Sequence, residues 1–336
     1  MLNIVEKRNI PFIISSVLFV VSVFLLAFVG LKPGIDFTGG TLMEVRFTEE
    51  RPSLEAVQAA IDTLDLGGVQ IQPTNEDAYL FKLRFLSEEE HQMVLIALRD
   101  TFATAHTEEV MEAVDEEPVE VTVESTDDAD VAMVVEEAAT QRILEERVET
   151  IGPSISSEFR SRALKAGIAV MIAIILFVAY AFRKVSKPVS SWKFGITAII
   201  ALLHDVTITM GVFVLLGKYF GVEVDIPFVV ALLTILGYSV NDTIVVFDRI
   251  REKLIKRGYD RFAETVNMGV NETLSRSINT SLTTLLVLTA LFLFGGDSIH
   301  YFSLALMLGI LLGTYSSIFL ASPLLVVWEE YKQKSK

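Results

Sequence analysis

Two groups of polar residues interrupt long apolar stretches of this sequence. His204 and Asp205 lie in IIALLHDVTITMG, and Asp242 lies in GYSVNDTIVVFDRI. An ionisable side chain at bilayer depth costs about 3 kcal/mol on insertion scales, so it normally faces the interior of a helix bundle and marks an ion or substrate path. A carboxyl group held there takes up or releases a proton when its partners change. These residues therefore predict a proton pathway.

Helical spacing assigns roles within the second group. Tyr238, Asp242 and Arg249 recur at i, i+4 and i+11 and share one stripe of a helix. Gly237 and Asn241 share the neighbouring stripe, where a small residue permits close approach of another helix. The predicted supporting polar and helix-packing positions are Tyr238, Asn241, Gly237 and Thr243.

Arg276 is the candidate partner of Asp242. It precedes the apolar part of NETLSRSINTSLTTLL, on the same side of the membrane toward which the Asp242 helix runs. Its long stem can reach along the bundle. Approach of the guanidinium favours the charged carboxylate, and its withdrawal favours proton uptake, so the pair would act as a proton switch.

Three alternatives stay open for these groups. Asp242 can be a permanently paired carboxylate that only fixes helix packing. Arg276 can be one more positive charge at the cytoplasmic end of a span. His204 and Asp205 can be a packed hydrogen-bonding pair rather than members of a relay.

The composition places these groups in a membrane protein. The chain has 336 residues, of which 51% are hydrophobic, and no cysteine, and its mean hydropathy is +0.50. The absence of cysteine excludes disulfides and thiolate sites, and with four scattered histidines we expect no metal site and no cofactor. Apolar runs of about 20 residues match the thickness of a bilayer. The predicted spans are 10–31, 164–182, 192–216, 226–248, 274–294 and 301–328, the first kept as an anchor.

Basic residues in the short loops predict the orientation. With six spans they fall on one side, in segments 1–9, 183–193, 249–273 and 329–336, whereas the opposite short loops carry only Lys218. Positive charge accumulates on the cytoplasmic side, so both termini are expected there, with 249–273 as a basic cytoplasmic loop. The basic residues concerned are Lys7, Arg8, Arg183, Lys184, Lys187, Lys193, Arg249, Arg251, Lys253, Lys256, Arg257, Arg261, Arg276, Lys332, Lys334 and Lys336.

This orientation places segment 32–160 outside as an acidic domain. It carries 30 Asp and Glu against 9 Lys and Arg residues, a net charge of −21, which disfavours nucleic acid as a partner. Alternating strands and two helices capped by Ser53 and Ser87 give the order βαββαβ, with a last strand at Arg147–Ile151, which predicts a small ferredoxin-like α+β domain. The stretch 108–137 interrupts it as an acidic insertion, either a solvated surface or a partner site.

Four motifs together resemble the SecF family, auxiliary subunits of the bacterial Sec protein-export machinery, which are similar to half of a transporter of the resistance-nodulation-division superfamily. They are GIDFTGGT (34–41), ETIGPSISSEF (149–159), ALLHDVTITMG (201–211) and GYSVNDTIVVFDRIRE (237–252), and they occur in order along the whole chain.

The resemblance implies a fold, residue roles and partners. The fold would be six transmembrane helices with one external α+β domain between the first two. It implicates Asp242 and Arg276 in proton conduction, gives His204 and Asp205 a less defined role in the relay, and implies a structural turn at Gly34, Asp36, Gly39 and Gly40. The implied activity is coupling of the proton motive force to late preprotein translocation and release at the inner membrane. The implied partners are SecD as a separate chain, the SecYEG translocon, unfolded preproteins and protons.

Other functions compete with this hypothesis. Half of a proton-driven small-molecule exporter would share the buried aspartate, but such exporters have about twelve spans and two external domains. An intramembrane aspartyl protease would need two catalytic aspartates, nominally Asp205 and Asp242, although HDV and NDT do not resemble the motifs of that class. A passive assembly scaffold would keep every packing feature. We expect a translocase accessory subunit that is not an enzyme.

Overall fold

The computed structural model describes residues 2–48, 51–74, 76–103, 143–181, 191–258 and 261–334. The chain forms two compact units, one of residues 1–33 and 161–336 and the other of residues 34–160. The predicted insertion at 108–137 lies outside the described residues.

The first unit is a helix bundle. The part of the chain that the structure describes contains six helices long and apolar enough to cross a membrane, as the hydropathy pattern predicts. The last of them passes through a π-helical turn, η2. The helices are α1 (Asn9–Phe28), α7 (Pro153–Ala181), α8 (Ser191–Phe220), α9 (Ile226–Arg257), α10 (Phe262–Phe294), and α11 (Asp297–Ser316) continued by η2 (Ser317–Ala321) and α12 (Ser322–Lys334).

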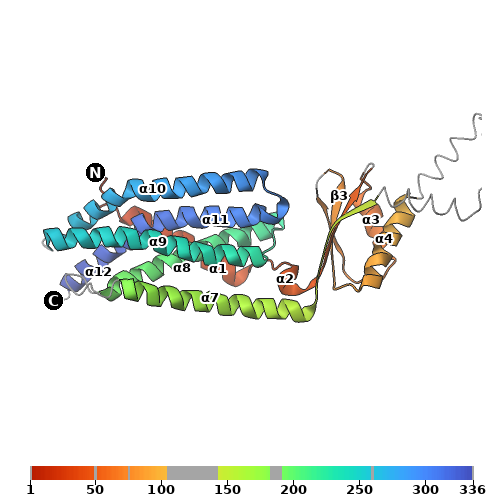
Figure 1. Cartoon of the computed structure of the whole chain (residues 1–336), viewed down its shortest axis with the longest axis horizontal. Helices are drawn as coiled ribbons and strands as arrows, with labels where there is room; N and C mark the ends of the chain where they lie inside the picture. Colours follow the sequence, from red (N-terminus) through yellow and green to blue (C-terminus); the bar gives the residue numbers. More distant parts are fainter. Residues whose placement is uncertain are drawn as a thin grey trace, which may run out of the picture. The chain divides into compact units, whose positions relative to one another are not determined.

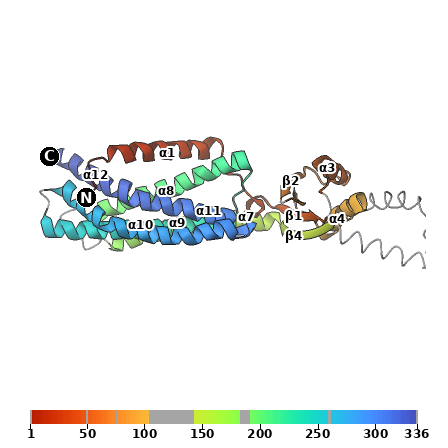
Figure 2. The same cartoon turned by 90° about the horizontal axis from the view of Figure 1, so that it is seen from above.

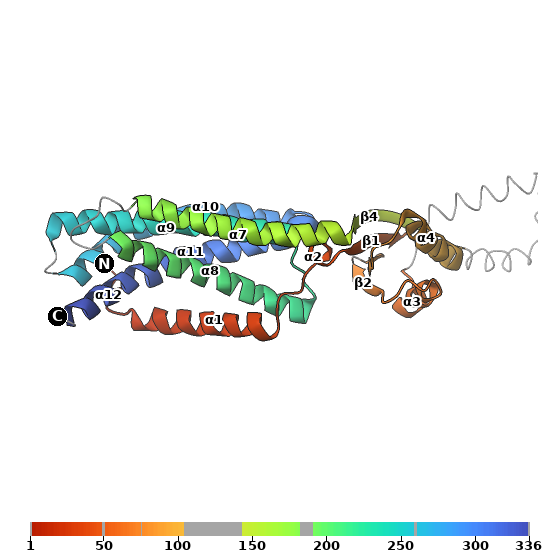
Figure 3. The same ribbon diagram turned by 90° about the horizontal axis from the view of Figure 1, so that it is seen from below.

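Helix α11 is central in this bundle and packs against α8, α9 and α10, while α1 packs along α8 (Figures 2 and 3). Both chain termini lie at the same end of the bundle as the α9–α10 connection (Figure 1), which we call the terminal end. Arg8 and Glu330 form an ion pair there. At the opposite end, which we call the Val224 end, Pro33 and Val224 form a parallel bridge.

The segment expected as a basic loop, 249–273, extends two of the helices. Helix α9 continues to Arg257 and α10 begins at Phe262, so most of this segment is helical. Ion pairs stabilise the polar extensions: Glu252 pairs with Arg249 and Lys256 within α9, and Glu272 on α10 binds Lys253 at 2.6 Å. Hydropathy detects the end of an apolar run, and a helix with such pairs continues into water beyond it.

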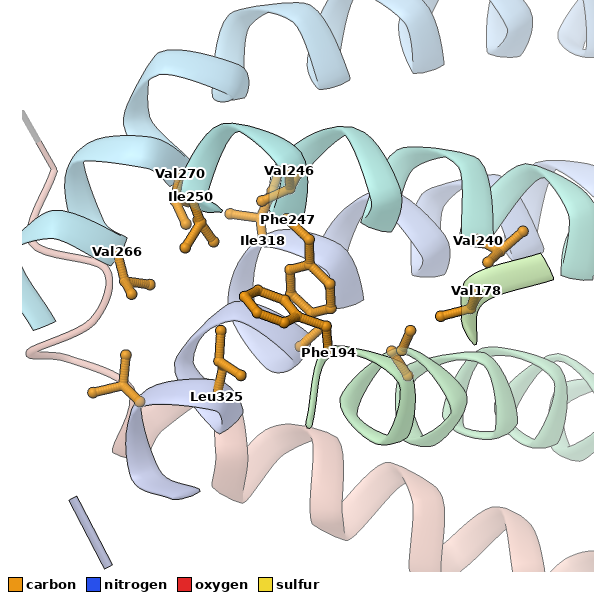
Figure 4. Packing of buried hydrophobic residues seen from close by; sticks show 14 of the residues in the cluster. Val178, Phe194, Val240, Val246, Phe247, Ile250, Val266, Val270, Ile318 and Leu325 are labelled. Atoms are coloured by element: carbon orange, nitrogen blue, oxygen red, sulfur yellow. The ribbon is translucent and has the colours of Figure 1, made fainter. Parts of the chain in front are cut away.

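The bundle has two clusters of buried apolar residues, and the one that includes Phe194 and Phe247 draws on most of its helices (Figure 4). Phe194 of α8 meets Phe247 of α9 edge to face, with ring centroids 5.2 Å apart. Ile318 of η2 and Leu325 of α12 pack beside them. Fully buried side chains at this density fix the rotation of α9 about its axis, and hence the direction of its polar stripe.

The second unit is a four-stranded antiparallel sheet with two helices on one side (Figure 1). Its strand order is β2-β3-β1-β4 and its sequence order is βαββαβ, which agrees with the ferredoxin-like prediction. Ser53 and Ser87 cap the helices, accepting from the backbone N–H of Ala56 and Glu90, each at 3.3 Å. The elements are β1 (Gly40–Phe47), α3 (Leu54–Asp62), β2 (Gln70–Thr74), β3 (Ala78–Leu83), α4 (Glu88–Ala103) and β4 (Ile143–Ile151).

The segment expected as a turn at Gly34–Gly40 contains a one-turn helix, α2 (Ile35–Thr38). Gly34 has extended backbone angles and Asp36 lies in the first turn of α2. Gly39 and Gly40 have positive φ, 74° and 135°. A Cβ on Gly40 would lie 2.7 Å from the carbonyl oxygen of Leu83, so the start of β1 requires glycine.

Candidate functional site

Asp242 is buried in the bundle, 9% exposed, and both of its carboxyl oxygens are hydrogen bonded. Ser277 of α10 donates to Oδ1 at 2.6 Å. Ser317, the first residue of η2, donates to Oδ2. The aspartate on α9 is therefore held by hydroxyl groups from two other elements of the bundle.

A second polar layer lies one helical turn toward the Val224 end. Tyr238 donates to the hydroxyl of Ser281 at 3.3 Å, and Ser281 also hydrogen bonds Thr314. Tyr238 precedes Asp242 by one turn on α9, whereas Ser281 and Thr314 stand one turn from the two serines that bind it. The stripe predicted from spacing thus faces α10 and α11, and hydroxyl groups line it between the carboxylate and the Val224 end.

An open cavity of about 460 Å³ lies between α9 and α10 on the terminal side of Asp242. Val245 and Thr273, one turn beyond Asp242 and Ser277, are among its lining residues. Arg276 also lines it, with an exposed side chain. The other lining residues are Ile244, Asp248, Arg249, Glu252 and Glu272.

The structure does not bring Arg276 onto Asp242. Among the described residues no hydrogen bond or ion pair joins the two side chains, and the carboxylate is bound by Ser277, which directly follows Arg276. Both residues nevertheless stand at the α9–α10 interface, Asp242 inside the bundle and Arg276 in the cavity. The predicted pairing of the two side chains is therefore absent from this structure.

His204 and Asp205 form a second buried cluster. Asp205 is fully buried, and Nδ1 of His204 lies 2.9 Å from its Oδ1. Its Oδ2 accepts hydrogen bonds from Ser239 of α9 at 2.6 Å and from Ser316, the last residue of α11, at 2.7 Å. This carboxyl group therefore also connects three elements.

Within the part of the chain that the structure describes, Gly237 packs against no helix, so its predicted packing role stays a prediction. Gly237 is exposed and a Cβ there would meet nothing within 4 Å, and Asn241 is exposed as well. The close approach to α9 is made instead by α11, where a Cβ on Gly309 would lie 2.2 Å from Ile235 and one on Gly313 would lie 3.0 Å from Ser239. The reason is helix phase: both stripes of α9 carry small or polar residues, and only the fold decides which one meets a helix.

Of the remaining predicted positions, Thr243 is fully buried and donates to the carbonyl oxygen of Ser239, on its own helix, at 3.0 Å. The prediction omitted Ser277, Ser316 and Ser317, although their hydroxyl groups hold the two carboxylates. The consecutive serines in GTYSSIF, inside an otherwise apolar run, were the available signal. Their partners lie on other helices, which spacing along one segment does not show.

Comparisons with known proteins agree along the chain. The family model "Protein export membrane protein SecD/SecF, C-terminal" matches residues 131–331, and the model "SecD/SecF GG Motif" matches residues 24–50. The protein translocase subunit SecF of Thermobaculum terrenum is 38% identical over 98% of this chain and 94% of its own length. That of Desulfurispirillum indicum is 35% identical over 96% of this chain and 90% of its own.

A solved structure shares the fold. The crystal structure of SecDF, a translocon-associated membrane protein from Thermus thermophilus, superposes with a TM-score of 0.73 and 32% identity over 98% of this chain. This chain covers 39% of that longer protein.

Proposed function

The chain belongs to the SecD/SecF family of protein-export membrane proteins, and on this premise we propose that it couples the proton motive force to late-stage translocation and release of preproteins across the cytoplasmic membrane. It is a polytopic membrane protein of the protein-transport machinery. In the proposal the termini are cytoplasmic, segment 32–160 is on the outer side, and SecD, SecYEG and unfolded preproteins are the partners.

The observation that carries the proposal is the hydrogen bonding of Asp242. Its two oxygens are bound by Ser277 and Ser317, both buried. A serine hydroxyl donates to a carboxylate but also accepts from a carboxylic acid, so these partners satisfy either protonation state. A buried carboxyl group between two hydroxyls can therefore change its proton occupancy without leaving an unpaired polar atom.

The surroundings supply a direction for proton movement. The hydroxyls of Tyr238, Ser281 and Thr314 lie toward the Val224 end from Asp242, and the charged cavity with Arg276 lies toward the terminal end. A proton that enters from outside would reach Asp242 through the hydroxyl layer and leave through the cavity. Arg276 would swing toward the deprotonated carboxylate and withdraw when the next proton binds.

The energy available suits such a cycle. A charge crossing a potential of 100 mV releases about 2.3 kcal/mol. One proton per cycle would then bias a conformational equilibrium by about 50-fold at most. This is sufficient to favour one direction of helix rearrangement, which the external domain would convert into directed release of an unfolded preprotein.

A partner chain completes the proposed unit. Transporters of this superfamily work as two related halves of about six spans each. On α9, Thr234, Gly237 and Asn241 form an exposed stripe at i, i+3 and i+7 inside the span, which we call the α9 outer stripe. Polar groups at this depth favour protein over lipid as a neighbour. We assign this stripe to the contact with the SecD half.

The proposal is tested by gradient-dependent release of a translocated preprotein from membrane vesicles. Wild type is compared with Asp242→Asn, each co-expressed with the partner subunit. The asparagine keeps the shape but cannot exchange a proton, so we expect assembly to be normal and the gradient-dependent part of release to be lost. Glu264→Gln is the control, because Glu264 is an exposed carboxylate of the bundle that does not line the cavity.

Unchanged release in Asp242→Asn would overturn the proton switch and leave Asp242 as a packing residue of a scaffold. A loss of equal size in Glu264→Gln would also contradict the proposal, because the effect would then follow the removal of any carboxylate from the bundle rather than the buried site.

A further inference from the structure

Two consecutive residues of this chain bind two different buried carboxyl groups. Ser316 donates to Asp205 of α8, and Ser317 donates to Asp242 of α9. They stand where α11 ends and the π-helical turn η2 begins. Consecutive residues of a helix point about 100° apart, which lets neighbours reach separate helices. π-helical turns are rare and occur frequently at functional sites.

Each of these serines has a second acceptor within reach. The hydroxyl of Ser316 lies 3.2 Å from the carbonyl oxygen of Gly313, and that of Ser317 lies 3.1 Å from the carbonyl oxygen of Thr314. A hydroxyl has one proton to donate, so the carboxyl oxygen and the carbonyl oxygen are alternative acceptors. Each serine can therefore turn between two hydrogen bonds without moving its backbone.

The geometry at Asp205 singles out Ser316 as the group that turns. Oδ2 of Asp205 accepts from both Ser239 and Ser316. When a proton binds Oδ2, that oxygen becomes a donor and one of the two hydroxyls must accept from it. Ser316 can redirect its own proton to Gly313, whereas the described contacts of the Ser239 hydroxyl include only Asp205.

Few ionisable side chains lie near Asp205 among the described residues. His204 is adjacent on α8, and its Nε2 is buried with no hydrogen-bond partner among them. Its Nδ1 lies 2.9 Å from Oδ1 of Asp205. The ionisable side chains of α9 near the site are Asp242 and Tyr238, and that of α11 is Tyr315. Helix α1 has no charged residue between Asn9 and Phe28, and Glu329 of α12 is paired with Lys193.

We propose that Asp205 is a second proton-binding site and that Ser316 and Ser317 link its protonation to that of Asp242. When a proton binds either carboxyl group, the serine that contacts it rotates its hydroxyl toward the carbonyl oxygen of Gly313 or Thr314. These two residues lie in the last turn of α11, and that turn positions both serines. The inference rests on the proposed proton switch at Asp242. It adds Asp205 as a second site, and it gives a route by which protonation of a carboxyl group on α8 affects protonation of one on α9.

The test is infrared spectroscopy of the full chain in complex with its partner subunit, in membranes, recorded as the pH is lowered. A protonated buried carboxyl group has a carbonyl stretch separate from that of a carboxylate. We expect two titrating bands, one absent in Asp205→Asn and the other absent in Asp242→Asn. We expect each substitution to change the proton affinity of the remaining carboxyl by about tenfold, by the same factor in both directions, because coupling between sites is reciprocal.

Serine variants test whether Ser316 carries the coupling between Asp205 and Asp242. The coupling factor should fall to near one in Ser316→Ala and be restored in Ser316→Thr, which keeps a hydroxyl. Ser303→Ala is the matched control, because Ser303 is a buried serine on α11 whose hydroxyl has no hydrogen-bond partner among the described residues. Coupling that survives Ser316→Ala would be direct repulsion between carboxyls and would overturn the serine link.

A missing Asp205 band across the accessible pH range would overturn the second site. This failure is distinguishable from failure of the proposed function. If Asp242→Asn abolishes gradient-dependent release but no Asp205 band exists, only the second site is wrong. If both bands and their coupling exist but release ignores Asp242, the coupled sites stand and the transport function is wrong.

Discussion

Ser277 donates a 2.6 Å hydrogen bond to Oδ1 of Asp242 across the interface between α10 and α9. A hydrogen bond to a charged group contributes about 1.5–3 kcal/mol. Ser277→Ala should therefore reduce the free energy of unfolding of the isolated chain in detergent by about 1–3 kcal/mol and also reduce gradient-dependent preprotein release.

The matched control is Ser275→Ala, because Ser275 is an exposed serine two residues earlier on the same helix. Detergent-unfolding titrations of the two variants measure the difference. Equal stability of both variants would mean that the Ser277 hydroxyl contributes nothing to holding Asp242.

Two glycines of the bundle should respond oppositely to the same substitution. A Cβ on Gly309 of α11 would lie 2.2 Å from the side chain of Ile235, whereas a Cβ on Gly237 of α9 would meet nothing. Overpacking costs about 1–3 kcal/mol, and replacing an open helical glycine by alanine gains up to about 1 kcal/mol. Thermal unfolding of the isolated chain should show Gly309→Ala destabilised and Gly237→Ala unchanged or stabilised; the reverse order would contradict the α9–α11 contact.

These glycines show where sequence reasoning succeeds and fails. Apolar runs predict the spans and hydroxyl caps predict the helices of the second unit, because both are local properties of the chain. The rotation of a membrane helix is not local, since lipid and helix neighbours are equally apolar. The stripe of Tyr238 and Asp242 is visible from spacing, but the helix it faces and the serines it meets are not.

The charged extension of α9 beyond its apolar run is also not predicted by the sequence pattern. Charges after an apolar run predict a loop, yet α9 continues to Arg257 because Glu252 and Glu272 neutralise its basic residues. Glu272 lies on the next helix, so the contact that stabilises the extension cannot be found by periodicity within α9.

Glu90 of the second unit should titrate at unusually low pH. Hydrogen bonding to Arg84, with the backbone N–H of Ser87, lowers the pKa of Glu90 to about 2. Its ordinary value is 4.5, so its stabilising contribution is present above that pH and is lost as the pH falls toward 2. Carboxyl-carbon NMR of the full chain should give this midpoint, and Arg84→Gln should raise it toward 4.5. An unchanged midpoint in that variant would assign the shift to the cap instead.

Two consecutive glutamates near the C-terminal end of the bundle differ in burial. Glu329 pairs with Lys193 at 2.5 Å, with side chains 12% and 3% exposed, whereas Glu330 pairs with Arg8, with side chains 42% and 22% exposed. Breaking a buried pair leaves an uncompensated charge and costs about 3–5 kcal/mol, and an exposed pair contributes about 0–1 kcal/mol.

Glu329→Gln should therefore be strongly destabilising and Glu330→Gln close to neutral in unfolding of the isolated chain. Lys193→Met combined with Glu329→Leu should recover most of the loss, because no charge stays buried. Similar losses for the two glutamine variants would show that the Lys193 site is hydrated.

Substitutions in the α9 outer stripe should have an effect only when the partner subunit is present. Gly237→Leu adds a large side chain to the stripe, and Gly167→Leu adds the same side chain to α7, where a Cβ also meets nothing within 4 Å. Both substitutions should leave the isolated chain folded. If the SecD half covers the stripe, Gly237→Leu should reduce its affinity for this chain by at least tenfold, about 1.4 kcal/mol, and Asn241→Leu should act in the same direction. Co-purification from membranes measures the difference. If Gly167→Leu loses the partner and Gly237→Leu keeps it, the contact lies on α7 and the assignment of the α9 outer stripe is wrong. The amide of Asn241 would then face lipid and have no role in helix packing.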